Sequence, residues 1–119
     1  MVVVVGDRND ADEERVWRAL DGLHAEQPIT LVVHGAAMVR QTGELVGVDL
    51  HADTWARVHW IKVEPHPPDW LTWSEDAEAM RTRQMIGRGA HLVLLVGDNR
   101  VAIEAAERLG VCVRRLSAN

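Results

Sequence analysis

Residues 1–6 read MVVVVG, and an apolar run closed by glycine returns at 29–35 as ITLVVHG and at 90–97 as AHLVLLVG. A short β-branched run without polar alternation is typical of a strand buried on both faces of a sheet. Between these runs lie segments whose apolar residues recur at helical spacing, as at Val16 and Leu20. Strands that alternate with helices in this way predict right-handed crossovers and a parallel sheet.

The first half of the chain predicts two strand-helix pairs after this pattern. Residues 1–6 should form the central strand, and Asp10 or Asp12 should cap a helix that ends at the EQP of residues 26–28. The segment DLHADTWARV, residues 49–58, predicts a second helix. We expect its apolar face to carry Leu50, Thr54 or Trp55, and Val58.

The second half predicts two more strand-helix units. WIKVEP at 60–65 is expected to be a strand, and a helix is expected to start at Ser74 and stop at Gly87 or Gly89. The segments that follow are a strand at 90–97, a helix at 100–110 and a last strand at 111–116. Residues 1–119 are thus predicted to form one α/β domain. Its fold is a three-layer Rossmann-like open parallel sheet of about five strands with helices on both faces.

Composition narrows the function classes. The chain has 119 residues, of which 47% are hydrophobic, and a formal net charge of -5 without a basic run. These values fit one compact domain and argue against a nucleic-acid partner. No leader and no apolar run long enough to span a bilayer is apparent, so we expect no membrane partner and a cytoplasmic protein. The single cysteine, Cys112, cannot form an internal disulfide, and its apolar context GVCVRRL predicts a core position.

Ligands of open parallel sheets bind beyond the carboxyl ends of the strands, where the strand order reverses. The loops at that edge carry five candidate donors, Arg8, His34, Arg40, His66 and Arg100. They also carry Gly6, Gly35 and Gly97, whose backbone amides can approach an anion closely. This set predicts a phosphate-bearing ligand. The alternative is that the glycines are ordinary turn residues and the arginines are solvated.

The histidines and tryptophans point to structure more than to chemistry. Asp49, His51 and Asp53 are two residues apart on a helix and do not face one another, and His51 and His59 are more than two turns apart. We therefore expect neither a metal nor a resident cofactor. The tryptophans are expected to be packing anchors, with Trp70 as the one expected to contact a ligand.

The ordered segments VVVVGDR, VVHGA, GVD, ADTWA, PDW, RTRQM, HLVLLVG and AAERLGVCV together resemble the YspA-type, YpsA-related branch of the SLOG superfamily. The resemblance implies a Rossmann-like fold that binds nucleotides or nucleotide-derived ligands such as NAD or ADP-ribose derivatives. A distant branch, the lonely-guy phosphoribohydrolases, cleaves the N-glycosidic bond of nucleoside monophosphates. The positions that match the family motifs are Gly6 with Arg8, His34 with Gly35, Gly47 with Asp49, Asp69 with Trp70, and Arg81 with Met85.

Two departures from the family pattern bear on the ligand. Thr82 follows Arg81 where the family has asparagine. The family loop Pro-Gly-Gly-x-Gly-Thr reads VGDNRV at residues 96–101. Side chains at two of its glycine positions and the charge of Asp98 would obstruct and repel a phosphate that bare amides would otherwise wrap.

The segment AAMVRQTGELV, residues 36–46, lies between the His-Gly and Gly-x-Asp motifs. The family usually joins these motifs by a few residues, so the segment looks like an insertion. We expect it to lie over the ligand crevice, where Arg40, Gln41 and Thr42 would replace the donors lost from the fourth loop. The alternative is a mobile surface loop with no role.

Three functions remain open, and whether the protein is an enzyme is open with them. The first is binding or sensing of a nucleotide-derived small molecule. Its expected ligand residues are Gly6, Arg8, His34, Gly35, Arg40, Asp49, Trp70, Arg81, Gly97 and Arg100. The second is an N-glycosidic hydrolase in which Glu104, at the position of the lonely-guy glutamate, and Arg81 are the catalytic candidates. The third is a degenerate module that forms a homodimer through the surfaces of Trp17, Trp55 and Trp73.

Overall fold

The computed structural model describes residues 1–117, and its centre is one parallel sheet. The strands lie in the order β3-β2-β1-β4-β5. Their bounds are β1 Val2–Val5, β2 Leu31–His34, β3 Lys62–Pro65, β4 Leu92–Val96 and β5 Cys112–Leu116. The first strand is central, as its sequence predicts.

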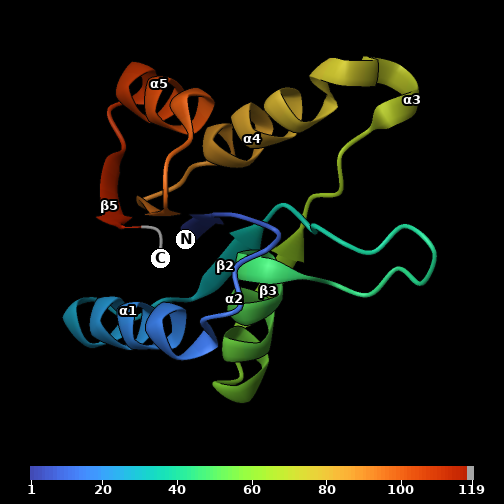
Figure 1. The fold of residues 1–119 in the computed structure, drawn as a ribbon. Helices are drawn as coiled ribbons and strands as arrows, with labels where there is room; N and C mark the ends of the chain where they lie inside the picture. Colours follow the sequence, from blue (N-terminus) through green and yellow to red (C-terminus); the bar gives the residue numbers. More distant parts are fainter. Residues whose placement is uncertain (118–119) are drawn as a thin grey trace.

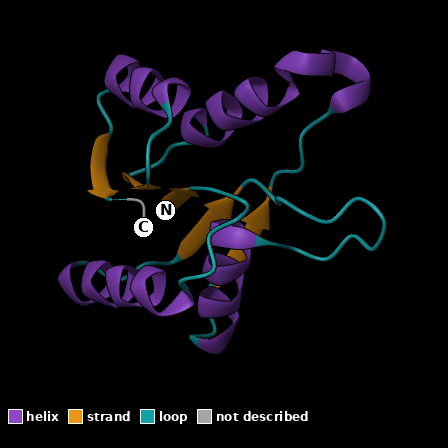
Figure 2. Cartoon of the chain, viewed as in Figure 1, coloured by secondary structure: helices purple, strands orange, loops and turns teal. Residues whose placement is uncertain are grey.

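The helices form two outer layers with the strands between them (Figure 2). On one side of the sheet lie α1 (Glu13–Glu26) and α2 (Gly47–Val58), and on the other lie α4 (Ala77–Gly87) and α5 (Arg100–Leu109) (Figure 1). A short helix, α3 (Trp70–Trp73), and a 3-10 turn, η1 (Ser74–Asp76), precede α4. The predicted three-layer Rossmann-like fold is confirmed. Within residues 1–117, no helix is both long and apolar enough to cross a membrane.

The all-valine strand β1 is buried because both of its faces are covered. Val2 and Val4 pack with α1 and α2 through residues such as Leu20. Val3 and Val5 pack with α4 and α5 through residues such as Met85. Since successive side chains of a strand point to opposite faces, alternate valines of β1 pack in the two different cores.

The predicted apolar face of α2 is confirmed at Trp55 but wrong at Leu50 and Val58. Leu50 and Val58 are 36% and 57% exposed, whereas Val48, Ala52 and Trp55 are completely buried. The helix begins at Gly47, two residues before the predicted segment, and the Val48 side chain packs in the core with β1. That first contact sets which face of the helix meets the sheet.

The expected helix start at Ser74 is also wrong. Ser74 has a φ of 49° and separates α3 from the turn that leads into α4. Helix α4 begins only at Ala77, and its N-cap residue Asp76 makes no side-chain cap hydrogen bond. The Asp69 carboxylate caps α3 instead, accepting a hydrogen bond of 3.1 Å from the backbone N–H of Thr72. By contrast, Asp12 does cap α1, accepting from the N–H of Arg15 at 3.1 Å, as predicted.

Cys112 and most tryptophans do not occupy the core. Cys112 is exposed because β5 is an edge strand whose residues up to Arg115 are exposed. Trp55 is the packing anchor that the sequence predicts and has no exposed surface with which to form a dimer. Trp17 is partly buried against the same core, Trp73 is 39% exposed and Trp60 is 96% exposed.

The core on the α1 side gives a direct test of this packing. Leu20→Ala removes a fully buried side chain, and we expect the free energy of unfolding to fall by about 2–5 kcal/mol because the cavity cannot close completely. Urea denaturation measures the change. Leu71→Ala is the matched control, since Leu71 is 99% exposed and its loss should change the free energy by less than about 0.5 kcal/mol. Equal losses in the two variants would contradict the described core.

Candidate functional site

A cavity of about 660 Å³ lies beyond the carboxyl ends of β1 and β2. Its walls come from the loops after these strands, the start of α2, the segment before α3, and α4, with Asn99 contributed by the loop after β4. In the sheet, β2 lies on one side of β1 and β4 on the other, so the strand order reverses at β1. The cavity lies at this point. This is the place where open parallel sheets bind ligands.

The structure brings most of the predicted ligand residues together here. Those that line the cavity are Gly6, Arg8, Gly35, Arg40, Asp49, Trp70 and Arg81. Those outside its lining are His34, Gly97, Arg100 and Glu104. Glu78 and Asn99 were not predicted, although Glu78 lies one helical turn before Arg81, and helical spacing from that arginine would have found it.

The motif glycines of the first two loops permit close packing. A Cβ on Gly6 would lie 2.5 Å from the Val48 side chain, and one on Gly35 would lie 2.5 Å from Nη1 of Arg81. Gly47 has a φ of 64°, and its Cβ would lie 2.3 Å from the carbonyl oxygen of Asp7. These glycines bring α2 and Arg81 against the strand ends, so they shape the cavity.

His34 is fully buried, and its side chain holds the loop that follows it in place. Its Nδ1 accepts a hydrogen bond of 3.0 Å from the N–H of Ala36, so the ring proton lies on Nε2, which donates to Asp53 at 2.8 Å. Burial alone would raise the pKa of Asp53, but hydrogen bonds from Arg57 and His34 outweigh it and lower the pKa. Ala36 is held at a φ of 54°, and this turn presents the next peptide to the cavity.

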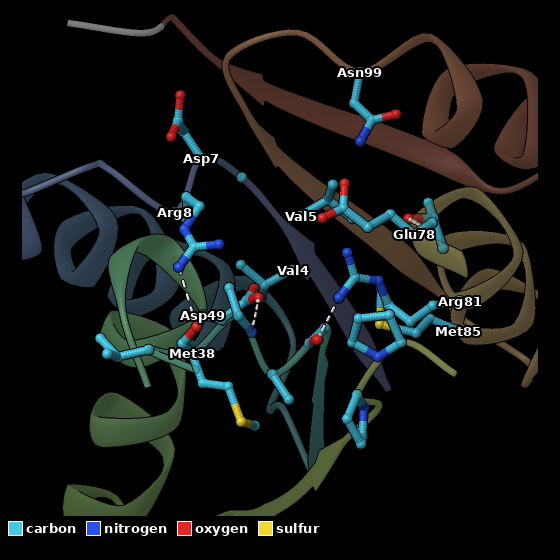
Figure 3. Close-up of a pocket in the computed structure, with 18 of the residues that line it drawn as sticks. Val4, Val5, Asp7, Arg8, Met38, Asp49, Glu78, Arg81, Met85 and Asn99 are labelled. Atoms are coloured by element: carbon cyan, nitrogen blue, oxygen red, sulfur yellow. Dashed lines mark hydrogen bonds between the residues drawn. The ribbon is translucent and has the colours of Figure 1, made fainter. Parts of the chain in front are cut away.

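Two arginines on opposite sides of the cavity are each anchored by a backbone carbonyl (Figure 3). Nη2 of Arg8 donates to the Met38 carbonyl at 3.0 Å, and Nη1 of Arg81 donates to the Gly35 carbonyl. Burial lowers the pKa of Arg81, while the charges of Asp49 and Glu78 oppose that effect. The Arg81 Nε is buried and has no hydrogen-bond partner among residues 1–117. The anchors leave each guanidinium with further N–H donors for a ligand.

Asp49 is a buried carboxyl within the same cavity. Its Oδ2 accepts a hydrogen bond of 2.9 Å from the N–H of Ala37, and the side chain lies between Arg8 and Arg81 in Figure 3. Burial raises the pKa of Asp49 and outweighs the effects that lower it, which come from the Ala37 N–H, from His34 and Arg81, and from the Gly35 N–H. The fold therefore keeps a carboxyl where its ionisation is costly.

The segment at 36–46 folds as a small hairpin. Met38 and Leu45 form an antiparallel bridge, and Val39 N–H donates to the Glu44 carbonyl at 2.8 Å. Its first arm and the start of its turn, residues 36–41, line the cavity, and the hairpin extends away from the sheet (Figure 1). Thr42 is outside the lining. The segment is a side wall of the cavity, with Arg40 and Gln41 as its polar contributions.

The loop after β4 differs from an open phosphate cradle. Asn99 caps α5 by accepting from the N–H of Ala102 at 3.1 Å, and Asp98 pairs with Arg115 of β5 at 3.1 Å. Arg100 and Glu104 pair with each other at 3.6 Å on the exposed part of α5. Only Asn99 of this loop reaches the cavity.

The histidine and aspartate side chains of α2 diverge. Asp49 faces the cavity, Asp53 binds His34, and His51 Nε2 donates to the Asp10 carbonyl at 2.8 Å. Within the described chain, no three potential metal ligands lie close enough to share an ion.

The fold and this cavity define a Rossmann-like α/β domain with a pocket at its topological switch point. Residues 1–73 match the family model YAcAr, described as the YspA, cpYpsA-related SLOG family, and the chain belongs to this family. The match includes β1 to β3 and the hairpin wall but stops before α4, which supplies Arg81. No curated protein and no solved structure matches the chain.

Burial of the Asp49 carboxyl predicts how the stability of the folded protein depends on pH. Because the pKa of Asp49 is raised by folding, its ionisation destabilises the folded state once the pH exceeds the ordinary value of 3.8. Asp49→Asn keeps an oxygen for the Ala37 N–H and removes the charge. We expect its Tm to exceed that of the wild type by a few degrees at pH 7 and the gain to vanish near pH 3.5.

Thermal unfolding at the two pH values measures this difference. Asp7→Asn serves as the control, since Asp7 lies at the same cavity but is exposed, and its change should not stabilise the protein. An Asp49→Asn variant that is less stable than the wild type at pH 7 would contradict the assigned cost of the buried charge.

Proposed function

We propose that the protein binds a nucleotide-derived small molecule, a nucleotide or an NAD- or ADP-ribose-like compound, in the cavity beyond β1 and β2. The observation that carries this proposal is the set of arginines at the cavity, Arg8, Arg40 and Arg81. Within residues 1–117, none of the three forms an ion pair within 4.0 Å. Most other arginines of the chain have such a partner, as Arg88 has in Glu64 and Arg115 has in Asp98.

Three cationic groups that form no ion pair within 4.0 Å among residues 1–117 favour an anionic ligand. Guanidinium groups bind phosphate oxygens with charge-assisted hydrogen bonds, and Arg8 and Arg81 are already held in position by backbone carbonyls. A preordered donor loses less side-chain entropy when a ligand binds. These features suit the phosphate groups of a nucleotide.

The size and remaining lining of the cavity support the same class of ligand. A volume of about 660 Å³ falls in the range of small-molecule sites, which is roughly 300–1,000 Å³. Trp70, which is 44% exposed, and the prolines before it give one wall an apolar surface on which a base can pack. Membership of the SLOG family adds support for a nucleotide-related ligand.

The two alternatives have weaker support. For a hydrolase, Glu104 is outside the cavity lining and pairs with Arg100, so the carboxyl groups near a bound ligand would be Asp7, Asp49 and Glu78. For a homodimer, Trp73 and Leu71 offer exposed apolar surface on α3, and sedimentation at high protein concentration tests it. Both remain predictions.

Binding is tested by calorimetry with ADP-ribose, NAD and AMP. Arg40→Ala should weaken the affinity for the compound that binds by about 1.5–3 kcal/mol, the scale of a charge-assisted hydrogen bond. The stability of the folded protein should stay nearly unchanged, since the exposed Arg40 side chain has no hydrogen-bond or ion-pair partner among residues 1–117.

Arg108→Ala is the matched control, because Arg108 is exposed near the end of α5 and does not line the cavity. It should bind as the wild type does. The proposal fails if none of the three compounds binds the wild type at millimolar concentration, or if Arg40→Ala and Arg108→Ala bind equally well.

A further inference from the structure

We infer that Asp49 makes the cavity selective for a phosphate ester of a hydroxylated sugar, with the arginines binding the phosphate and Asp49 accepting hydrogen bonds from the sugar hydroxyl groups. This inference rests on the proposed function and goes beyond it, because it assigns the part of the ligand that faces Asp49. The inference implies that the protein binds ribose-containing ligands more tightly than deoxyribose analogues or bare phosphate.

The first step is that a site built only for an anion would not contain this carboxyl. Asp49 shares the cavity with Arg8, Arg40 and Arg81 and is 5% exposed. A buried negative charge repels a phosphate and costs stability. The Ala37 N–H that binds Oδ2 needs only a neutral acceptor, and although the charge of Asp49 attracts that of Arg81, the two side chains form no ion pair within 4.0 Å among residues 1–117.

The second step is that Asp49 retains capacity to accept. A carboxylate has two oxygens and about four lone-pair sites, and the backbone N–H groups of Ala37 and Gly35 use only part of this capacity. Burial favours a hydrogen-bond donor at this position, because a donor offsets the cost of keeping the carboxylate away from water.

The third step identifies the donor. An ammonium group would satisfy Asp49 but would be repelled by the three guanidinium groups of the same cavity. A hydroxyl group is neutral, so it can donate to Asp49 while an adjacent phosphate meets the arginines. Phosphate next to hydroxyl groups is the chemistry of a sugar phosphate, and in a nucleotide-derived ligand that sugar is ribose.

The fourth step is the expected selectivity. A ligand that lacks the recognised hydroxyl leaves the buried carboxylate without its donor, and sites built around such a bond reject the analogue strongly. The cavity should therefore bind ribose-containing compounds better than their deoxy forms.

The test is calorimetric titration with AMP, ADP-ribose and the 2′-deoxy and 3′-deoxy forms of each. We expect the wild type to bind at least one deoxy form about tenfold or more weakly than its parent compound. In Asp49→Asn this ratio should fall to within about threefold, since the charge that strengthens the hydrogen bond is gone. Thermal unfolding shows that the variant is folded.

Glu78→Gln is the matched control, because it removes another negative charge that lines the cavity without changing Asp49. It should keep the wild-type preference for the hydroxylated compounds. Equal binding of parent and deoxy compounds by the wild type, or loss of the preference in Glu78→Gln but not in Asp49→Asn, overturns this inference and leaves the proposed function standing. If neither parent compound nor NAD binds the wild type, both are overturned.

Discussion

The contact between the start of α2 and the end of β1 determines the shape of the candidate site. Val48 N–H donates to the Asp7 carbonyl at 3.1 Å, and Gly47 adopts a positive φ so that its backbone can lie against Asp7 and Arg8. Gly6 leaves room for the Val48 side chain. Because α2 is seated there, Asp49 is directed into the cavity and both ends of the hairpin at 36–46 are fixed beside the sheet.

The second constraint is the turn after β2. His34 accepts from Ala36 and donates to Asp53, so a buried side chain sets the path of the loop without entering the cavity lining. The turn then supplies the Gly35 carbonyl to Arg81 and the Ala37 N–H to Asp49. One loop thus positions a cation and a carboxyl from two different helices, so groups of opposite charge line one cavity.

Sequence patterns predicted the sheet because burial on both faces leaves a clear trace, as in the valines of β1. The position of the cavity followed from the same reasoning, since a parallel sheet brings the loops after β1 and β2 to one edge. The phase of α2 could not be predicted, because it depends on Gly47 packing under Asp7, a contact between distant residues. Cys112 was misplaced for a related reason: its apolar neighbours do not reveal that β5 is an edge strand.

The central claim is that the cavity beyond β1 and β2 binds the phosphate-bearing part of a nucleotide-derived ligand. An amide NMR titration of the ¹⁵N-labelled wild type with ADP-ribose tests it most directly. We predict shifts that saturate and that concentrate at Gly6, Arg8, Ala37, Arg40 and Asn99, with little change along β5. Shifts that are absent at millimolar ligand, or that concentrate on β5 or on the far end of α1, would contradict the claim.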